Sequence, residues 1–414
     1  PAEVEQPEAP TPPIKPNIDP GPMIGPVTIP RDSTPEPSID SARLDRPDVG
    51  IPSDAPVKPS IDSARVGDPL AVSMDRSPPK AEAPVRLSFV GDISLGTTTL
   101  PDGVPADSGR GLLAAVAPLL IGDMVVGNFE SAVGDTGSPS KCRRDDGTIR
   151  QQCYAFVAPT HLLPRLAEAG FTHLNLANNH ANDMGSEGRS MAERSLEALG
   201  IRTYGPLERL SIDTLYRADS ITVVGLIGFA TYPHSYNLLD VTASEGLVAS
   251  VRPLVDVLIV TFHGGSEGVD AVHTPDGPEF LGREPRGDLR TWARAVVDAG
   301  ADAVIGHGPH VLRGIEFYRG RPIAYSLGNF ATYRGFNLSG PLGITAILGL
   351  ELGSDGAFRS ARLQPLYQIP RAGPRTDPAG RAIALVRRLS TEDFGATAAR
   401  IGDGGEILPP PEAK

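Results

Sequence analysis

The sequence predicts an α/β fold for the part of the chain that begins near Val85. From that residue onward, short apolar runs typical of buried strands alternate with helical patterns, as they do in βα units packed around a sheet. Three of the helical patterns end at a glycine, the residue that commonly follows the last turn of a helix. A length of 414 residues with 40% hydrophobic residues is sufficient to bury a core.

The predicted strands and helices alternate as far as Ile305. The strands are Leu87–Val90, Met124–Gly127, Thr172–Leu176, Ile221–Gly228, Val257–Phe262 and Ala303–Ile305. The helices are Thr160–Ala169, Glu187–Leu199 and Leu289–Ala299, followed by Gly170, Gly200 and Gly300. After Gly306 the pattern changes to hairpin strands, one short helix and a tail that we expect to be frayed. These later elements are the strands Ile315–Tyr318, Ile323–Ser326, Ile344–Leu352 and Arg359–Leu366 and the helix Ala379–Leu389.

The first 84 residues differ in composition from the rest of the chain. They hold 20 of the 42 prolines and few aromatic residues, so we predict an extended arm or linker instead of a core. The phrase Pro-Asn-Ile-Asp at 16–19 returns as Pro-Ser-Ile-Asp at 37–40 and 59–62. The arm is either a semi-rigid spacer or a row of docking motifs for a partner assembly. We therefore divide the chain into the arm 1–84, a folded domain 85–370, and a C-terminal helix and tail 371–414.

Charge and hydropathy argue against two classes of protein. The formal net charge of −12, with scattered arginines, argues against a nucleic-acid partner, since phosphate binding needs clustered Lys and Arg. No run of about eighteen apolar residues is present, so we expect no membrane span in this sequence. Because the sequence starts at Pro1 without a charged and apolar leader, we expect that an N-terminal signal or anchor has been removed.

The two cysteines, Cys142 and Cys153, lie eleven residues apart in a polar stretch. We interpret them as a disulfide that closes a surface loop. The alternative is a pair of free thiols in a cytosolic protein. The two alternatives predict different compartments, because disulfides persist in oxidising surroundings.

Nearly every predicted strand is followed at once by a polar residue that can bind metal. These residues are Asp92, Asn128, Glu130, Asn178, Asn179, His180, His263, His307 and His310. The carboxyl ends of parallel strands share one edge of a sheet, so residues far apart in sequence can converge there. Carboxylates, amide oxygens and imidazoles suit divalent ions such as Zn, Mn or Fe, and two such ions can clamp an oxyanion. A single residue of this kind is more often a turn former or a cap, but five strand ends together favour a metal site.

The same residues lie in motifs that resemble those of the CapA family of bacterial capsule-synthesis proteins. In order, the motifs are Gly91-Asp92, Asn128-Phe129-Glu130, Asn178-Asn179-His180 with Asp183 and Gly185, His263 with Glu267, Gly306-His307-Gly308-Pro309-His310-Val311, and Ser326-Leu327-Gly328-Asn329-Phe330. The similarity runs from about Leu87 to about Pro370. The family is similar to calcineurin-like metallophosphatases, so the resemblance implies a metallophosphoesterase-like layered β-sandwich flanked by helices. It also implies a role in making or exporting poly-γ-glutamate or another capsule polymer.

The resemblance implies a role for each matching residue. Asp92 would be the first carboxylate ligand, Glu130 a carboxylate that bridges two ions, and Asn179 an amide-oxygen ligand. His180 would act as a general acid or steady the charge that develops on the substrate. The remaining ligands would be the imidazoles of His263, His307 and His310. Residues that orient the ligands would be Asn128, Asn178, Asp183, Glu267 and Asn329.

Three positions depart from the pattern of the broader metallophosphatase superfamily. Ser94 stands two residues after the first Asp, where the superfamily usually has His, and Glu130 replaces the bridging Asp. Two residues separate His307 from His310, where one is usual. A site with one ligand fewer can hold one ion instead of two, act on a different bond, or only recognise a polymer.

Two functions follow from the resemblance. In the first, the chain is an envelope-associated, metal-dependent hydrolase-type enzyme of capsule or poly-γ-glutamate synthesis or export, acting on an anionic polymer or its precursor. In the second, it is a non-catalytic polymer-binding or scaffold subunit, tethered to an envelope protein assembly through residues 1–84. Both predict a periplasmic or extracellular location. A phosphodiesterase of nucleotides or phospholipids is a more distant alternative.

Overall fold

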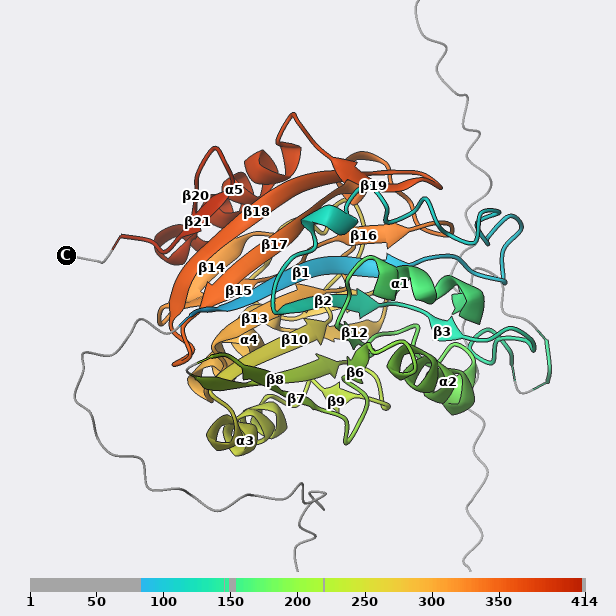
Figure 1. The fold of residues 1–414 in the computed structure, drawn as a ribbon, viewed down its shortest axis with the longest axis horizontal. Coiled ribbons are helices and arrows are strands. Elements are labelled where there is room, and N and C mark those ends of the chain that lie inside the picture. The colour runs from blue at the N-terminus through green and yellow to red at the C-terminus, as the bar shows by residue number, and fades with distance from the viewer. Residues whose placement is uncertain (1–82, 145, 149–153, 219, 412–414) are drawn as a thin grey trace, which may run out of the picture. The chain divides into compact units, whose positions relative to one another are not determined.

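The computed structural model describes residues 83–144, 146–148, 154–218 and 220–411, whose fold is drawn in Figure 1. All but the last two residues of the predicted arm, and Cys153, lie outside the described residues. The arm and the disulfide therefore stay predictions. No described helix is both long and apolar enough to cross a membrane.

Two mixed sheets form the body of the fold (Figure 1). Across the first sheet the strands are β20 (Arg400–Ile401), β21 (Glu406–Leu408), β18 (Phe358–Ile369), β17 (Ile344–Leu352), β1 (Val85–Ser94), β2 (Met124–Phe129), β5 (His173–Asn175) and β6 (Arg202–Tyr204), with β16 (Asn329–Thr332) beside β1 and β19 (Gly373–Thr376) beside β18. Across the second they are β14 (Ile315–Tyr318), β15 (Arg321–Ala324), β13 (Ala303–His307), β10 (Val257–His263), β8 (Ile221–Ala230) and β7 (Ser211–Tyr216), with β9 (Tyr236–Asn237) beside β8. Two small pairs are β3 (Ala132–Val133) with β4 (Val157–Ala158), and β11 (Glu279–Leu281) with β12 (Glu284–Gly287).

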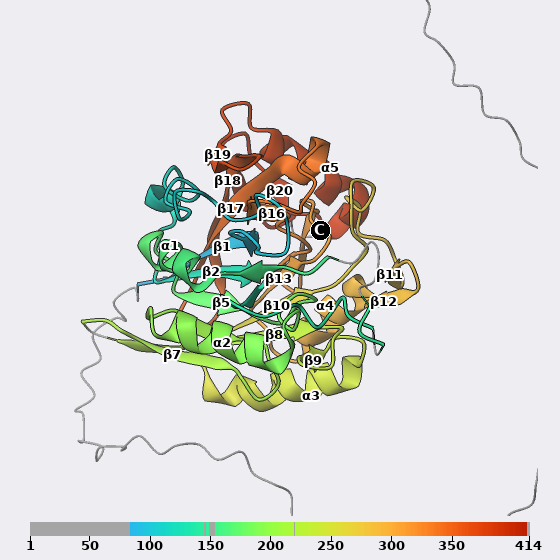
Figure 2. The same ribbon diagram turned by 90° about the vertical axis from the view of Figure 1, so that its right-hand side faces the viewer.

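Helices complete the fold around these sheets (Figures 1 and 2). The α-helices are α1 (Pro164–Glu168), α2 (Gly185–Glu197), α3 (Val241–Val251), α4 (Leu289–Asp298) and α5 (Arg381–Phe394). Short 3₁₀ turns are Ala117–Leu119, Thr160–Leu162, Arg252–Leu254, Gly340–Gly343 and Gly395–Thr397.

Among the described residues, the three largest hydrophobic clusters correspond to the layers of the fold. Between the sheets, β1 contributes Leu87 and Phe89 and β10 contributes Val257 and Ile259 to one buried cluster. On the outer face of the first sheet, Leu166 of α1 and Leu196 of α2 pack over Val125 and Leu174. On the outer face of the second sheet, α3 and α4 cover Ile227 and Val260, and Trp292 of α4 is fully buried there. The predicted layered β-sandwich flanked by helices is confirmed.

Strand direction brings the polar strand ends to one edge of each sheet. Strands β1, β2, β5 and β6 run parallel to one another, and so do β8, β10, β13 and β15. Across the first sheet, the register places Asn329, Asp92, Asn128 and Asn175 side by side. Across the second, His263 lies opposite His307. Each sheet therefore carries one row of polar residues at the carboxyl ends of its parallel strands.

Several sequence-based predictions need correction. The tail is not frayed through Leu408, because β21 pairs with β18 and Ile407 is buried. The predicted helix Thr160–Ala169 is a 3₁₀ turn followed by α1, since Pro164 has no amide hydrogen to continue a helix and instead begins a new one. The predicted strand Ile323–Ser326 is β15, Arg321–Ala324, two residues earlier. Helix α3, capped by the Asp240 side chain, was not predicted.

The chain passes very close to itself beside the polar row of the first sheet. A Cβ atom placed on Gly91 would lie 1.8 Å from the carbonyl oxygen of Gly328. The same oxygen accepts a hydrogen bond of 2.8 Å from the amide of Asp92. Glycine at position 91 is therefore required by the approach of two backbones, and the approach positions Asp92.

We expect Gly91→Ala to lower the free energy of unfolding by about 1 to 3 kcal/mol, the usual cost of overpacking a tight contact. The thermal midpoint of purified protein, followed by circular dichroism, measures the change. Gly246→Ala in α3 is the matched control, because a Cβ there meets nothing within 4 Å. The control should stabilise the protein by about 0.5 to 1 kcal/mol, since alanine is the better helix former. A wild-type midpoint for Gly91→Ala would contradict the close approach.

Candidate metal centre

The two polar rows bring six of the predicted site residues into one buried cluster. Asp92 comes from the irregular end of β1, Glu130 follows β2, and His263 and His307 end β10 and β13. Asp92, Glu130 and His263 are fully buried, and each offers a ligand atom within 4.8 Å of the others. His310 and Glu267 contact the same cluster from loops after β13 and β10. The predicted convergence of these strand ends is observed.

Short distances join the carboxylates to the imidazoles. The Nδ1 atoms of His310 and His307 lie 3.0 and 3.5 Å from the two carboxylate oxygens of Asp92. One carboxylate oxygen of Glu130 lies 3.8 Å from the Nε2 atoms of both His263 and His310. Glu130 thus contacts both His263, at the end of β10, and His310, in the loop after β13.

Several buried ligand-type atoms have no hydrogen bond among the described residues. They are both carboxylate oxygens of Glu130, Nε2 of His263, Nδ1 of His307 and the side-chain oxygen of Asn179. A buried polar atom left without a partner costs about 1 to 3 kcal/mol, so such atoms are rare in groups. Carboxylate, imidazole and amide oxygen are also the donors that a borderline divalent metal ion prefers. The residues therefore fit a divalent cation.

The pKa shifts of Glu130, His310 and Asp92 are those expected where buried carboxylates have too little positive charge around them. Burial raises the pKa of Glu130 well above its ordinary value. Burial favours neutral His310, but the charges of Glu130 and Asp92 outweigh it and raise the pKa of His310 to about 10. For Asp92, burial is outweighed by the hydrogen bond from His310 and by the proximity of the His307 and His310 imidazoles, which lower its pKa. A proton on His310 supplies positive charge, and binding of a cation would displace it because ligands bind deprotonated.

Asn128 holds ligands of the two sheets together. Its Nδ2 donates to Asp92 over 2.9 Å and lies 3.3 Å from Nδ1 of His263. Its own side-chain oxygen accepts hydrogen bonds from Asn175 and Asn178, at 3.2 and 3.1 Å. Asn178 also accepts from the amide of His180, over 3.0 Å. Asn175 was missed in the sequence because it stands inside a predicted strand among apolar residues.

His180 is oriented by a carboxylate and a lysine at the rim of the cluster. Its Nδ1 lies 2.6 Å from Asp183, and the buried Asp183 also accepts from the amide of Phe156, over 2.7 Å. The Lys141 ammonium lies 3.2 Å from both Asp183 and His180. Burial lowers the pKa of His180, and Asp183 partly offsets that shift. Lys141 was not predicted, because it stands in an aperiodic loop that carries no motif.

Glu267 contacts the side chain of His310, and Asn329 contacts its backbone. The carboxylate of Glu267 lies 3.7 Å from Nε2 of His310 and 2.9 Å from the guanidinium of Arg286. The fully buried Arg286 also donates to the carbonyl of Gly265 over 3.0 Å. Asn329 donates to the carbonyl of His310 over 3.1 Å and so holds that residue in its left-handed backbone conformation, at φ +62°.

Ser94 does not take the place of the missing histidine. Its hydroxyl lies 3.0 Å from that of Ser131, with which it shares a hydrogen bond. Ser94 therefore does not replace the histidine ligand that the broader superfamily has at this position.

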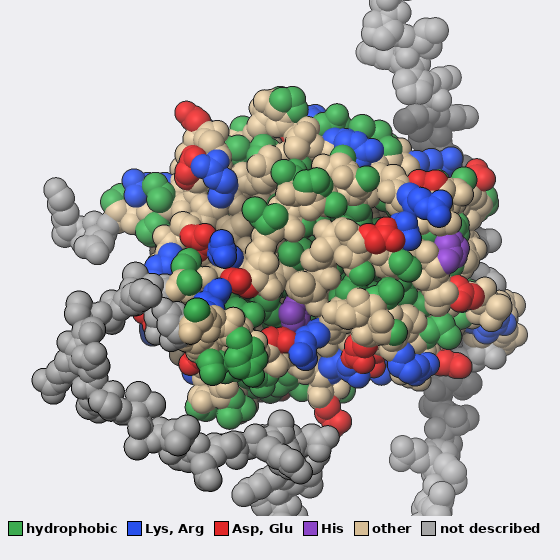
Figure 3. All heavy atoms as spheres, in the orientation of Figure 1, with side chains coloured by type: hydrophobic (Ala, Val, Ile, Leu, Met, Phe, Trp, Pro, Cys, Tyr) green, Lys and Arg blue, Asp and Glu red, His purple; other side chains and the backbone are tan. Residues whose placement is uncertain are grey.

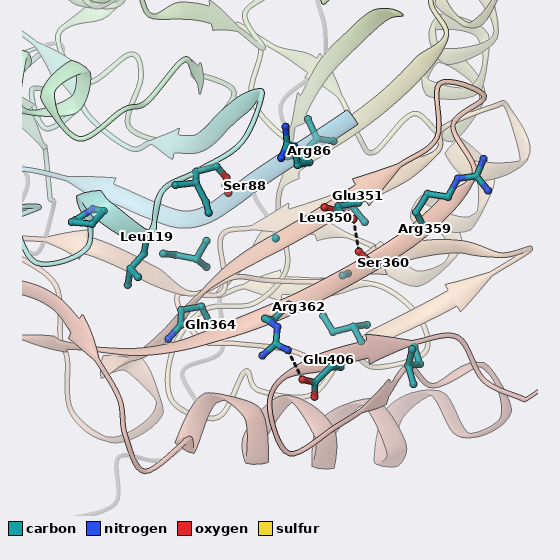
Figure 4. Close-up of a pocket in the computed structure, with 18 residues that line it drawn as sticks. Arg86, Ser88, Leu119, Leu350, Glu351, Arg359, Ser360, Arg362, Gln364 and Glu406 are labelled. Carbon is teal, nitrogen blue, oxygen red and sulfur yellow. Dashed lines mark hydrogen bonds and ion pairs between the residues drawn. The ribbon is translucent and has the colours of Figure 1, made fainter. Parts of the chain in front are cut away.

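One groove of the protein lies away from this cluster. A hollow of about 600 Å³ runs over β1, β17 and β18, as Figure 4 shows. Its walls combine apolar residues such as Leu119 with ion pairs such as Arg362 and Glu406. None of the site residues predicted from the sequence borders this groove.

Comparison with known proteins places this site in a family. Residues 86–334 match the family described as "Bacterial capsule synthesis protein PGA_cap". The chain is 30% identical over 269 residues to the "PGA biosynthesis protein CapA" of Bacillus subtilis, covering 60% of this chain and 63% of that protein. It is 29% identical over 231 residues to the "Capsule biosynthesis protein CapA" of Bacillus anthracis, covering 52% and 51%.

The chain thus spans less than two thirds of the length of either relative. Among solved structures, a 5'-nucleotidase precursor from Thermus thermophilus aligns with a TM-score of 0.38 and 11% identity, covering 74% of this chain and 59% of that one. The match to the family extends over more than half of the 414 residues. This protein therefore belongs to the bacterial capsule synthesis PGA_cap family, as the resemblance of its motifs predicted.

Proposed function

We propose that this protein is a metal-dependent, hydrolase-type enzyme that acts on poly-γ-glutamate or a related anionic capsule polymer, or on its precursor. The observation that carries the proposal is the buried cluster of Asp92, Glu130 and His263, in which atoms of Glu130 and His263 are unpaired. Hydrogen bonds through Asn128 and Asn178 connect this cluster to His180. The names of the two Bacillus relatives, which describe PGA and capsule biosynthesis, support the choice of substrate.

The cluster would hold one or two divalent transition-metal ions, Zn, Mn or Fe. The ligands would be Asp92, Glu130, Asn179, His263, His307 and His310, which offer carboxylate, amide and imidazole donors. A bound ion supplies a Lewis acid for a phosphoryl or carbonyl oxygen of the substrate. Without a ligand at Ser94, one of two ion positions is the weaker.

His180 would donate a proton to the leaving group. Its Nδ1 is held by Asp183, so Nε2 is the ring nitrogen that can face a substrate. Lys141 and Asp183 keep the ring in place, and Asn128, Asn178, Glu267 and Asn329 keep the ligands in place. The retained donor set weighs against the alternative of a non-catalytic polymer-binding or scaffold subunit.

We also propose a periplasmic or extracellular location in the bacterial cell envelope. A disulfide between Cys142 and Cys153 would suit that compartment and would brace the loop that carries Lys141. Residues 1–84 would tether the folded domain to an envelope assembly, either as a spacer or through their repeats.

Metal content tests the proposed centre. Elemental analysis of wild-type protein should give about one or two ions per chain, and the double variant Glu130→Gln/His307→Ala should give close to none, because it loses two buried ligands. The matched control is Glu392→Gln/His161→Ala, which makes the same chemical changes at exposed positions. If the wild-type protein takes up no metal, the proposal of a metal-dependent enzyme is wrong, and the polymer-binding subunit is favoured.

The role of His180 is tested by turnover of bis-para-nitrophenyl phosphate and of a γ-linked glutamate polymer. His180→Ala should abolish turnover and leave metal content intact. Asp183→Asn should lower turnover about 10- to 100-fold, as loss of an orienting partner usually does.

The pH profile separates orientation from simple disruption. Asp183 raises the pKa of His180 and Lys141 lowers it. Asp183→Asn should therefore move the alkaline limb of the profile to lower pH, because the acid form of His180 is lost sooner. Lys141→Gln should move the same limb to higher pH. Shifts in the same direction for both variants would argue against His180 as the general acid.

A further inference from the structure

A second, basic hollow lies beside the metal centre. It measures about 410 Å³ and is lined by side chains that include Leu100, Tyr333, Arg334, Phe336, Asn337 and Arg371. The loop of residues 333–338 follows β16, and the amide of Tyr333 donates to the carbonyl of Ser94 at the end of β1 over 2.9 Å. The hollow therefore opens at the same sheet edge as Asp92.

One aromatic side chain separates this hollow from the site. Phe336 lines the hollow, and its ring centroid lies 5.3 Å from that of His310 in an edge-to-face contact. Phe336 also stacks on Phe156 at 4.7 Å, and Phe156 lies 4.3 Å from His180. The two phenylalanine rings therefore connect the wall of the hollow to His310 and His180.

The positive charges of the hollow are available to a ligand. Arg334 is exposed and makes no hydrogen bond or ion pair with the described residues. Arg371 lies 3.8 Å from Asp102, but these side chains are 45% and 78% exposed, and such surface pairs hold each other weakly. By contrast, Arg286 at the metal centre is buried and engaged by Glu267.

This concentration of charge contrasts with the rest of the protein. The chain carries a net charge of −12, and acidic and basic side chains are interspersed over the face drawn in Figure 3. An anionic polymer would be repelled by the molecule as a whole, so it needs local cations near the site to bind. Arg334 and Arg371 supply them next to the metal ligands.

We propose that this hollow is a subsite for the carboxylate groups of a γ-linked glutamate chain whose reacting unit lies at the metal centre. The inference rests on the proposed function and adds the residues that bind the chain. In such a polymer, each unit presents one carboxylate and two methylene groups. The guanidinium groups of Arg334 and Arg371 bind carboxylates, and the apolar walls of Leu100, Tyr333 and Phe336 pack against the methylenes.

Fluorescence anisotropy with a labelled γ-linked glutamate decamer tests the subsite on the full-length, metal-loaded protein. Arg334→Gln/Arg371→Gln should weaken binding about tenfold or more, which corresponds to about 1.4 kcal/mol. The control is Arg359→Gln/Arg388→Gln, which removes two charges from exposed arginines that pair with Asp355 and Glu392 and do not line the hollow. The control should bind as wild type does.

The outcomes distinguish the subsite from the proposed function. Equal weakening in both double variants, or none in either, would overturn the subsite, whereas metal content and turnover of the wild-type protein would still judge the enzyme. Wild-type protein that binds a polyphosphate of similar length but not the glutamate decamer would overturn the assignment to carboxylates. Tenfold weakening confined to Arg334→Gln/Arg371→Gln would support it.

Discussion

The carboxamide of Asn128 is the contact on which the arrangement of the site depends. It reaches from the first sheet to Asp92 on the neighbouring strand and to His263 on the second sheet. Its far end is held by Asn175 and Asn178, so the group cannot turn. Ligands that come from two separate sheets thereby keep a fixed separation. A metal ion needs such a preorganised set, because ligands held loosely lose affinity for it.

The layers of the fold explain why Asp92, Glu130 and His263 are buried. The core between the sheets ends at the polar rows, and helices and loops close the outer faces. Burial makes the unpaired atoms of Glu130, His263 and His307 costly in the absence of a cation. The same burial strengthens their attraction for a cation, since charge is poorly screened there. The cost of burying these atoms and the attraction that the cluster would exert on a cation therefore have one cause.

The basic side chains around the candidate metal centre form three groups. Next to the ligands, Arg286 is neutralised by Glu267 and stabilises the loop after β10. At the rim, Lys141 is engaged by Asp183 and His180. Farther out, beyond Phe336, Arg334 and Arg371 border open space. The inner cations thus maintain the structure of the site, whereas Arg334 and the weakly paired Arg371 are the exposed cations that we propose bind an anionic chain on a protein that is acidic as a whole.

Residues whose positions depend on local sequence were predictable. Apolar runs and helix-ending glycines predicted β14 and β17 with their observed bounds, and β1, β2, β8, β10 and β13 within a few residues. The polar residues after those runs predicted the ligand cluster, because strand polarity alone decides at which edge they lie. The motifs added the roles of Asn179 and His180, which remain proposals.

Contacts between distant segments were decided only by the tertiary structure. β21 forms because β18 offers it an edge, so the sequence of the tail did not reveal it. Lys141 approaches His180, and Arg371 shares a hollow with Arg334, through loops whose sequences have no period. Asn175 was hidden inside a strand, and its partner Asn128 lies on another one. The sequence by itself determined where the central strands of the two sheets form and which chemical groups end them. Only packing of the two sheets decided which of those groups touch, because contact distances depend on all layers at once.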